Sequence, residues 1–233
     1  MSTATSELRL GGAPLALRVD RRARRLRLRV DRRSGGLMLT MPAGMSRRRA
    51  LAWAGGHEAW ARQALAALPA SMRLEPGAEL PLYGRPHRVA WSPDRPRRVA
   101  MEDDRILCGG PAAGLEGRLS RWLKAEALVL LTIETREIAA ALPAKLGRVG
   151  IGDPRSRWGS CSSRGDIRYS WRLILAPDFV RRATVAHEVA HLVYMNHGPE
   201  FHALAARLFG SDPKPAREWL RRHGAELHRI AAQ

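Results

Sequence analysis

A five-residue run late in the chain, His187-Glu188-Val189-Ala190-His191, constrains the fold more than any other feature. It matches the pattern H-E-x-x-H, and a further histidine, His197, lies six residues after the second one. On an α-helix, residues i and i+4 lie one above the other on the same face, so His187 and His191 can bind one metal ion together. The pattern therefore predicts a helix here, with Glu188 placed as a general base beside the metal.

The third metal ligand has to come from a part of the chain that turns back, because two ligands on one helix hold a metal ion weakly. Asn196 tolerates the left-handed backbone that ends many helices, so we predict a turn that brings His197 to the first two histidines. Three imidazoles leave a fourth tetrahedral position for water, as in catalytic zinc sites. Zinc lowers the pKa of that water towards about 7, and Glu188 can take its proton. Glu200, His202 and Asn196 itself remain alternative third ligands.

Length and composition are those of a globular protein. The 233 residues are 45% hydrophobic and 27% charged, enough for one large or two small domains. The N-terminus has no apolar signal core, and the most apolar run, 127–133, is too short to span a bilayer, so we expect no membrane association. Two cysteines, Cys108 and Cys161, predict a reduced, cytoplasmic protein without a disulfide framework. Cys161 is expected to be a small packed residue, with a redox or metal-competing thiol as the alternative.

The charge of the chain is strongly positive. Forty Lys and Arg against 22 Asp and Glu give +18, and all but three of the cations are Arg. Such a field attracts nucleic acid and other anions, although a general compositional preference for Arg would produce the same excess. Nine arginines fall between residues 18 and 33, where their alternation with Leu and Val favours a solvated strand face over a nucleic-acid-binding strip.

The pattern of apolar and turn residues predicts a mixed order of strands and helices. The expected strands are 24–30, 37–41, 80–83, 87–91, 97–101, 106–108, 149–151 and 167–175, with 153–163 as a loop or edge strand, and the expected helices are 46–68, 115–142, one beginning at Pro177, 199–209 and 213–228. We expect a loosely held tail over 1–17, a β-rich lobe over 18–110 and a catalytic region over 111–233, with the boundary in the stretch from Gly109 to Gly114.

Three motifs in a fixed order resemble the YgjP-like metal-dependent hydrolases, which are related to the SprT-like and other zincin metallopeptidases. The motifs are Arg157-Trp158-Gly159-Ser160-Cys161, then Ile167-Arg168-Tyr169-Ser170-Trp171-Arg172-Leu173-Ile174 with Ala176-Pro177, then the H-E-x-x-H helix with Asn196-His197-Gly198-Pro199-Glu200-Phe201. The clear match spans about residues 155–205. Ser170 and His202 depart from the usual Asn and Trp of the family, which affects the expected shape of the pocket more than metal binding.

This resemblance implies an α+β fold in which the β-rich N-terminal lobe precedes a zincin-like core, a small sheet packed on helices; 18–229 as a single YgjP-like domain is the alternative. It implies Zn²⁺ held by His187, His191 and His197, with Glu188 as catalytic base. The segment from Arg157 to Ser160 could line the substrate cleft, because a glycine in an edge strand permits close approach of another backbone. The candidate substrate-binding residues are Arg157, Trp158, Gly159, Ser160 and Arg172.

Three functions follow from these residues. The first is a zinc peptidase that binds an extended polypeptide along residues 157–161. The second is a metal-dependent nucleoside triphosphate (UTP) pyrophosphatase in which Arg155, Arg157, Arg168 or Arg172 binds phosphates. The third is a non-catalytic, basic nucleic-acid-binding module with a structural metal, and Glu188 counts against it because a structural site needs no base. We expect the peptidase, with a polypeptide or nucleotide as the partner.

Overall fold

The computed structural model describes residues 8–31, 34–68, 71–154 and 156–231. It divides into two compact units, an N-terminal unit of residues 1–71 with 232–233 and a C-terminal unit of residues 72–231. Each unit has a hydrophobic core of its own. Strands and helices occur in both units, so the predicted α+β class is confirmed.

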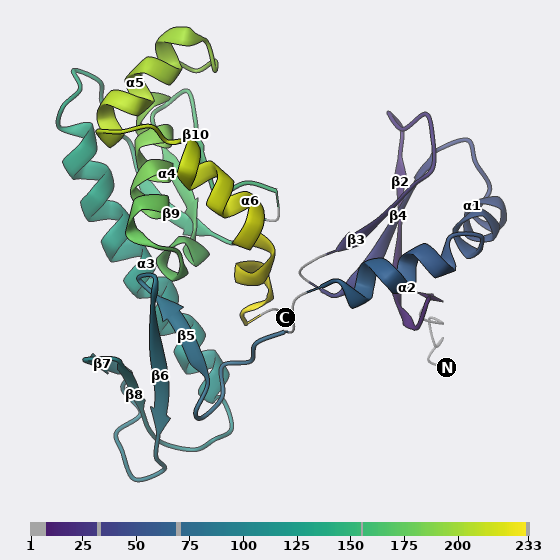
Figure 1. Cartoon of the computed structure of the whole chain (residues 1–233), viewed down its shortest axis with the longest axis horizontal. Helices are drawn as coiled ribbons and strands as arrows, with labels where there is room; N and C mark the ends of the chain where they lie inside the picture. The colour runs from purple at the N-terminus through teal and green to yellow at the C-terminus, as the bar shows by residue number, and fades with distance from the viewer. Residues whose placement is uncertain (1–7, 32–33, 69–70, 155, 232–233) are drawn as a thin grey trace. The chain divides into compact units, whose positions relative to one another are not determined.

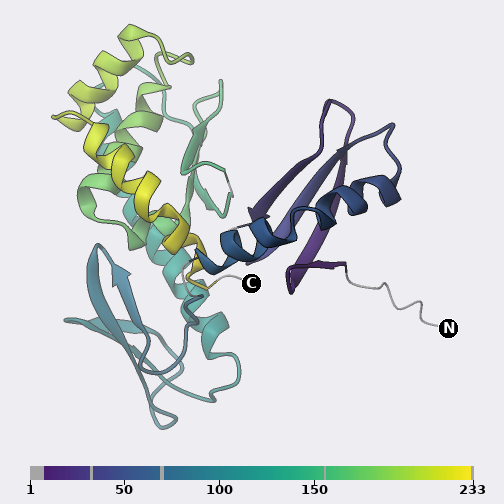
Figure 2. The same cartoon turned by 45° about the vertical axis from the view of Figure 1, so that its right-hand side comes forward.

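The N-terminal unit is a four-stranded sheet with two helices along one face (Figures 1 and 2). Its elements are β1 (Arg9–Leu10), β2 (Ala13–Asp20), β3 (Arg27–Asp31), β4 (Gly36–Pro42), α1 (Arg47–Gly55) and α2 (Glu58–Ala66). The strand order is β1-β2-β4-β3, with β2 parallel to β4 and β3 antiparallel to it. Leu15, Leu37 and Leu39 alternate onto the face that packs on Ala50 and Ala54 of α1.

Two expectations for this unit change. The predicted tail over 1–17 is wrong for its described part, because residues 9–10 and 13–17 belong to β1 and β2 and Leu15 is buried. The strands predicted over 24–30 and 37–41 correspond to β3 and β4, which pair antiparallel. The single helix predicted over 46–68 is broken at Gly55-Gly56, where glycine's conformational freedom disfavours a continuous helix. Ser46 caps α1, accepting a hydrogen bond from the Arg49 amide at 3.4 Å.

The C-terminal unit contains two small sheets and four long helices (Figure 1). The first sheet has the order β5-β6-β8-β7 and the second β10-β11-β9. Their strands are β5 (Glu79–Leu82), β6 (Arg85–Trp91), β7 (Ala100–Glu102), β8 (Arg105–Cys108), β9 (Val149–Gly152), β10 (Gly159–Cys161) and β11 (Ile167–Ser170). The helices are α3 (Leu115–Ala139), α4 (Asp178–Ala190), α5 (Pro199–Phe209) and α6 (Lys214–Arg229), with a short 3-10 helix η1 (Trp171–Leu175) before α4.

One continuous core joins both sheets to helices α3, α4 and α6, while the buried residues of α5 form a smaller cluster with Ala190. Leu80 and Ile106 of the first sheet, Leu119 of α3 and Val189 of α4 all belong to the continuous core. The boundary predicted at residues 110/111 therefore lies inside the C-terminal unit, and the division between units falls at residues 71/72. The glycines that suggested a linker are in close contact with the chain instead: a Cβ added at Gly109 would lie 2.0 Å from the Arg95 carbonyl oxygen.

The strand predicted over 167–175 ends early. Only Ile167–Ser170 pair with neighbouring strands, and Trp171–Leu175 form η1, whose residues are all buried. A strand with one solvated face alternates between buried and exposed residues, so this uninterrupted burial explains why the apolar pattern did not separate strand from helix. No helix in the described part of the chain is long and apolar enough to cross a membrane.

Candidate metal centre

Helix α4 carries the H-E-x-x-H residues, as predicted. It follows Pro177, whose missing N–H costs nothing at a helix start. Val180, Val185 and Val189 are among the side chains it buries in the core. Thr184, His187, Glu188 and His191 follow the spacing i, i+3, i+4, i+7 of one helix face, and all four line one cleft. The helix ends at its cap, His191, and the chain then turns back towards α4 before α5 begins.

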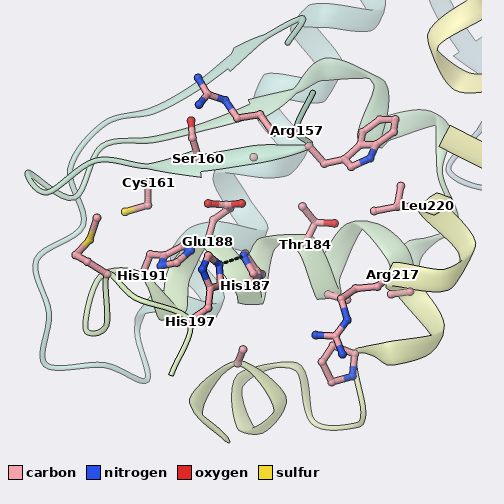
Figure 3. Close-up of a pocket in the computed structure, with 17 residues that line it drawn as sticks. Arg157, Ser160, Cys161, Thr184, His187, Glu188, His191, His197, Arg217 and Leu220 are labelled. Atoms are coloured by element: carbon pink, nitrogen blue, oxygen red, sulfur yellow. Dashed lines mark hydrogen bonds between the residues drawn. The ribbon is translucent and has the colours of Figure 1, made fainter. Parts of the chain in front are cut away.

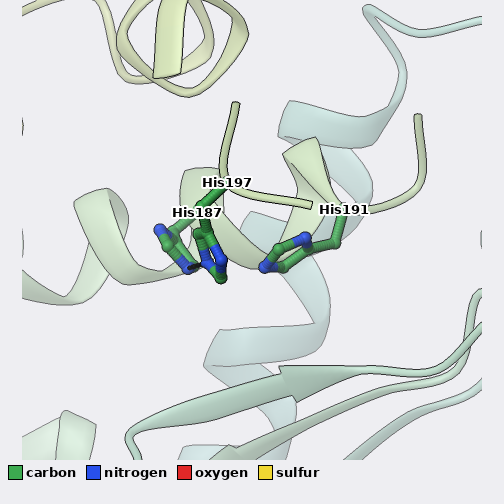
Figure 4. Close-up of side chains that lie close together, drawn as sticks. All are labelled: His187, His191 and His197. Carbon is green, nitrogen blue, oxygen red and sulfur yellow. Dashed lines mark hydrogen bonds between the residues drawn. The ribbon is translucent and has the colours of Figure 1, made fainter. Parts of the chain in front are cut away.

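Three histidines converge on one point (Figure 4). One ring nitrogen from each of His187, His191 and His197 can be chosen so that all three lie within 4.8 Å of one another. The Nε2 atoms of His187 and His197 are 3.2 Å apart. Ligands about 2.0–2.1 Å from a tetrahedral zinc ion lie about 3.3 Å from each other, so this spacing suits a metal centre. Glu200 and His202, the alternative ligands, are outside the group.

For His187 and His197, the surroundings favour the neutral imidazole that metal binding requires. Burial, followed by repulsion from His191 and His197, lowers the pKa of His187 to about 4. Burial and the neighbouring imidazoles also lower the pKa of His197. The Nδ1 atom of His191 lies 2.9 Å from the backbone carbonyl oxygen of Tyr194. A carbonyl can only accept, so Nδ1 carries the proton and Nε2 keeps its lone pair for a metal.

Phe201 of α5 fixes the orientation of the three rings. Its ring centroid lies 4.4 Å from that of His191, 4.7 Å from that of His197 and 4.8 Å from that of His187. The Phe201 side chain is fully buried, so a dry apolar wall stands behind the histidines. Such a wall strengthens electrostatic interactions at the site and limits the movement of the imidazoles.

Glu188 is buried next to the histidines and is only 5% exposed. Burial raises the pKa of its carboxyl to about 7, and the Arg157 guanidinium opposes this rise. Strand β10 passes directly over it: a Cβ added at Gly159 would lie 2.5 Å from Cγ and Oε1 of Glu188. Glycine is therefore required at this position to let the strand and the carboxylate approach each other.

The histidines and Glu188 open into a cleft of about 490 Å³ (Figure 3), a size typical of small-molecule sites. One wall is the segment from Arg157 to Cys161, so four of the five predicted substrate-binding residues line it. Trp158 also stacks on His228 of α6 at 4.8 Å, which ties this wall to the C-terminal helix. Burial, followed by the charge of Glu188, raises the pKa of the Cys161 thiol to about 11, so the thiol stays protonated at neutral pH.

Arg172, the fifth predicted substrate-binding residue, is outside the cleft, and that prediction is wrong. Its side chain is fully buried, with Nε 3.0 Å from Oδ1 of Asp153. Its Nη1 donates to the backbone carbonyls of Leu227 and Ile230. Arg172 therefore attaches the end of α6 to the core and cannot bind a phosphate. Arg155, another phosphate-binding candidate, lies outside the described residues, and Arg168 donates to the Ile151 carbonyl at 3.1 Å.

Sequence reasoning missed two side chains of the cleft. Thr184 precedes His187 by three residues, so helical periodicity alone would have placed it on the same face. Arg217 comes from the first turn of α6 and reaches the cleft from the wall opposite β10 (Figure 3). Its position depends on how α6 packs against α4, and no local pattern in the sequence indicates that packing.

A family model described as YgjP-like, metallopeptidase domain, matches residues 24–223 of the chain. Searches with the chain found no matching curated protein and no matching solved structure. The matched range includes the cleft, the three histidines and Glu188, together with most of the N-terminal unit.

Proposed function

Because the chain belongs to the YgjP-like metallopeptidase-domain family, we propose that it is a zinc-dependent hydrolase that cleaves peptide bonds. His187, His191 and His197 hold the metal. The convergence of their ring nitrogens within 4.8 Å, with the Nε2 atoms of His187 and His197 3.2 Å apart, supports this assignment. A divalent metal at such a site supplies a Lewis acid and an activated water. The small sheet β10-β11-β9 with helices α3 and α4 serves as a zincin-like core.

Glu188 acts as the general base in this proposal. A base is most effective when its pKa is close to the working pH, and burial brings the pKa of Glu188 to about 7. Its carboxylate accepts a proton from the attacking water and delivers it to the leaving nitrogen. A purely structural metal site has no use for a buried carboxylate held under a glycine of the adjacent strand, which argues against a non-catalytic role.

The observation that carries the peptidase assignment is the open edge of β10. Among the residues that the structure describes, this strand pairs with β11 on one side and has no partner strand on the other. The Ser170 amide donates to the Trp158 carbonyl at 2.8 Å, and the Ser162 amide donates to the Asp166 carbonyl at 2.9 Å. Because successive residues of a strand direct their backbone groups to opposite sides, Gly159 and Cys161 present N–H and C=O groups to the cleft. An extended polypeptide can pair with these groups as an added strand and lie across Glu188.

A nucleotide substrate is the second candidate, and two arginines favour it. Arg157 and Arg217 line opposite walls of the cleft, and within the described residues neither guanidinium has a hydrogen bond or ion pair. Free guanidiniums at this position can bind phosphates bidentately. They can equally bind acidic side chains of a polypeptide, so we place this function second.

The assay that tests the proposal compares zinc-loaded wild type with Glu188→Gln on an unfolded polypeptide and on a panel of nucleoside triphosphates that includes UTP. We expect polypeptide cleavage, reduced about 10²–10⁴-fold in Glu188→Gln at unchanged zinc content. Glu200→Gln removes a carboxylate from the nearby first turn of α5, outside the cleft lining, and serves as the matched control. Turnover of nucleotides alone, dependent on Glu188, would overturn the peptidase assignment.

A further inference from the structure

The positive charge of the chain is concentrated in the N-terminal unit. Its 71 leading residues contain 14 Arg and 4 Asp or Glu, which gives +10, whereas the remaining 162 residues contain 26 Lys or Arg and 18 Asp or Glu, which gives +8. A general preference for arginine would distribute the excess along the whole chain. The unit that contains no residue of the metal centre therefore carries more than half of the net charge.

Seven exposed arginines surround one side of this unit, and we call them the cationic face. They are Arg18 of β2, Arg27 and Arg29 of β3, and Arg21, Arg22, Arg24 and Arg25 of the connection between these strands. Helices α1 and α2 cover the opposite face of the sheet (Figures 1 and 2). The side chains of Arg18, Arg27 and Arg29 alternate with those that pack on the helices, so they project from the opposite face, which none of the described elements of this unit covers.

The pairing register fixes how these arginines are spaced. Arg18 and Arg27 lie on either side of Thr40 in the central strand β4, so their Cα atoms are two strand spacings, about 9.5 Å, apart. Arg27 and Arg29 are two residues apart along β3, about 6.7 Å. Each strand of a DNA duplex carries one phosphate per about 3.4 Å of helix axis, so neighbouring arginines of the face can contact different phosphates of one strand.

The protein itself does little to neutralise this face. Arg18 lies 3.8 Å from Asp20 in an exposed pair. The other six guanidiniums have no ion pair or hydrogen bond within the described residues. Asp31 lies at the opposite end of β3 from Arg27, where it pairs with Gly36 of β4. Charged side chains on an edge strand such as β3 protect it from unwanted pairing, but that role does not need seven arginines. The seven arginines repel one another, and a bound anion would reduce this repulsion.

We propose that the cationic face binds nucleic acid through its phosphate backbone, without reading the base sequence. Nucleic acid carries a dense and regular array of negative charge, about one per 1.7 Å of duplex axis. The strands of the unit contain no aromatic residue on which bases could stack. A surface that binds a membrane would present large exposed apolar side chains. The residues at the centre of the cationic face are instead Thr40 and Met38, and both are half-buried.

The test measures binding of the full-length protein to a fluorescein-labelled duplex of about 30 base pairs, and to one of its strands, by anisotropy over a range of salt concentrations. The variant R18A/R27A/R29A removes three arginines of the face. Its matched control, R47A/R48A/R49A, removes three exposed arginines from the first turn of α1, the helix that covers the other side of the sheet. Circular dichroism checks that both variants stay folded. Neither substrate nor metal is present, so the outcome is separate from that of the hydrolase assay.

We expect wild type to bind both oligonucleotides, with an affinity that falls steeply with salt. Each phosphate contact contributes about 0.9 to the slope of log K against log salt for a duplex, so R18A/R27A/R29A should lower the slope by about 2–3 and the control by less than about 1. Equal losses of DNA affinity in the two triple variants would show that DNA is attracted by the net charge in general, and this result would overturn the proposed site. Binding to anionic phospholipid vesicles but not to DNA would also overturn it.

Discussion

At the scale of single residues, the contact between Gly159 and Glu188 determines where the general base can lie. The carboxylate is buried beneath β10, and a side chain at position 159 would occupy the space of Cγ and Oε1 of Glu188. The same close approach keeps bulk water from the carboxylate, and burial is the main cause of its raised pKa. One missing side chain therefore determines both the position and the acidity of the base.

Gly159→Ala should displace Glu188 while leaving the histidines in place. We expect polypeptide hydrolysis to fall about 100-fold or more, because general-base catalysis contributes about 10²–10⁴, with zinc affinity unchanged. Gly150→Ala is the control: it adds the same methyl group to β9 of the same sheet, where no atom lies within 4 Å of the new Cβ. Equal activities of the two variants would show that the approach of β10 to Glu188 is unimportant.

Residue-level prediction from sequence succeeded where the chemistry is local. The H-E-x-x-H spacing and the turn before His197 placed three imidazoles together, because helix geometry and one turn suffice to do so. It failed for Arg172, since that side chain is buried by α6, which lies more than 40 residues further along the chain. The Tyr194 carbonyl that fixes the His191 tautomer was also missed, because every residue has a carbonyl and only the fold selects one.

At the scale of elements, a buried ion pair connects the motif helix α4 to the long helix α3. Arg181 donates to both carboxylate oxygens of Glu134, at 3.0 and 2.9 Å, and both side chains are about 5% exposed. Arg182, the next residue, makes a similar bidentate pair with Glu137 on the surface. The two pairs join the same helices but differ in their exposure to solvent.

Arg181→Ala should destabilise the C-terminal unit by about 3–5 kcal/mol, because it leaves the Glu134 carboxylate buried without its partner. Arg182 lies 3.8 Å from Glu134 and should keep the loss near the lower end of that range. Arg182→Ala removes a solvent-exposed pair whose arginine is 39% exposed, and it should lower stability much less, because solvent screens such pairs. Urea denaturation of the two variants measures the difference, and equal midpoints would refute this view of how α4 is held.

Element types were predictable where periodicity was strong, as in α3, α5 and α6, whose bounds fall close to the predicted ones. The least predictable element was η1. Its residues are buried on all sides by α3, α6 and β5, so the apolar run contained no alternation to separate a strand from a helix. That burial is a property of the packed unit and not of the local sequence.

At the scale of the whole molecule, the two units divide the chain differently from what glycine content suggested. Glycines such as Gly109 and Gly110 predict a flexible boundary when only the sequence is considered. In the structure they pack against Arg95 and Arg97. The first sheet of the C-terminal unit shares its core with α3, so residues 72–231 need each other to bury it. The site residues all belong to this unit.

Residues 72–231 should therefore fold without the N-terminal unit. We expect the fragment to show a cooperative unfolding transition and to bind one equivalent of zinc, because its core and its three histidines are complete. Circular dichroism and equilibrium dialysis measure the two properties. An unfolded or zinc-free fragment would show that the N-terminal unit is required for the metal centre.

The central claim is that His187, His191 and His197 form one open metal centre, and a zinc-binding titration tests it most directly. Wild type should bind one equivalent, and His197→Ala should bind it at least about 100-fold more weakly, since even residues outside the ligand set change affinity 10–100-fold. His202→Ala, in which the substituted ring lies 6.3 Å from that of His197, should bind like wild type. Undiminished binding by His197→Ala, or loss of binding in His202→Ala instead, would contradict the account.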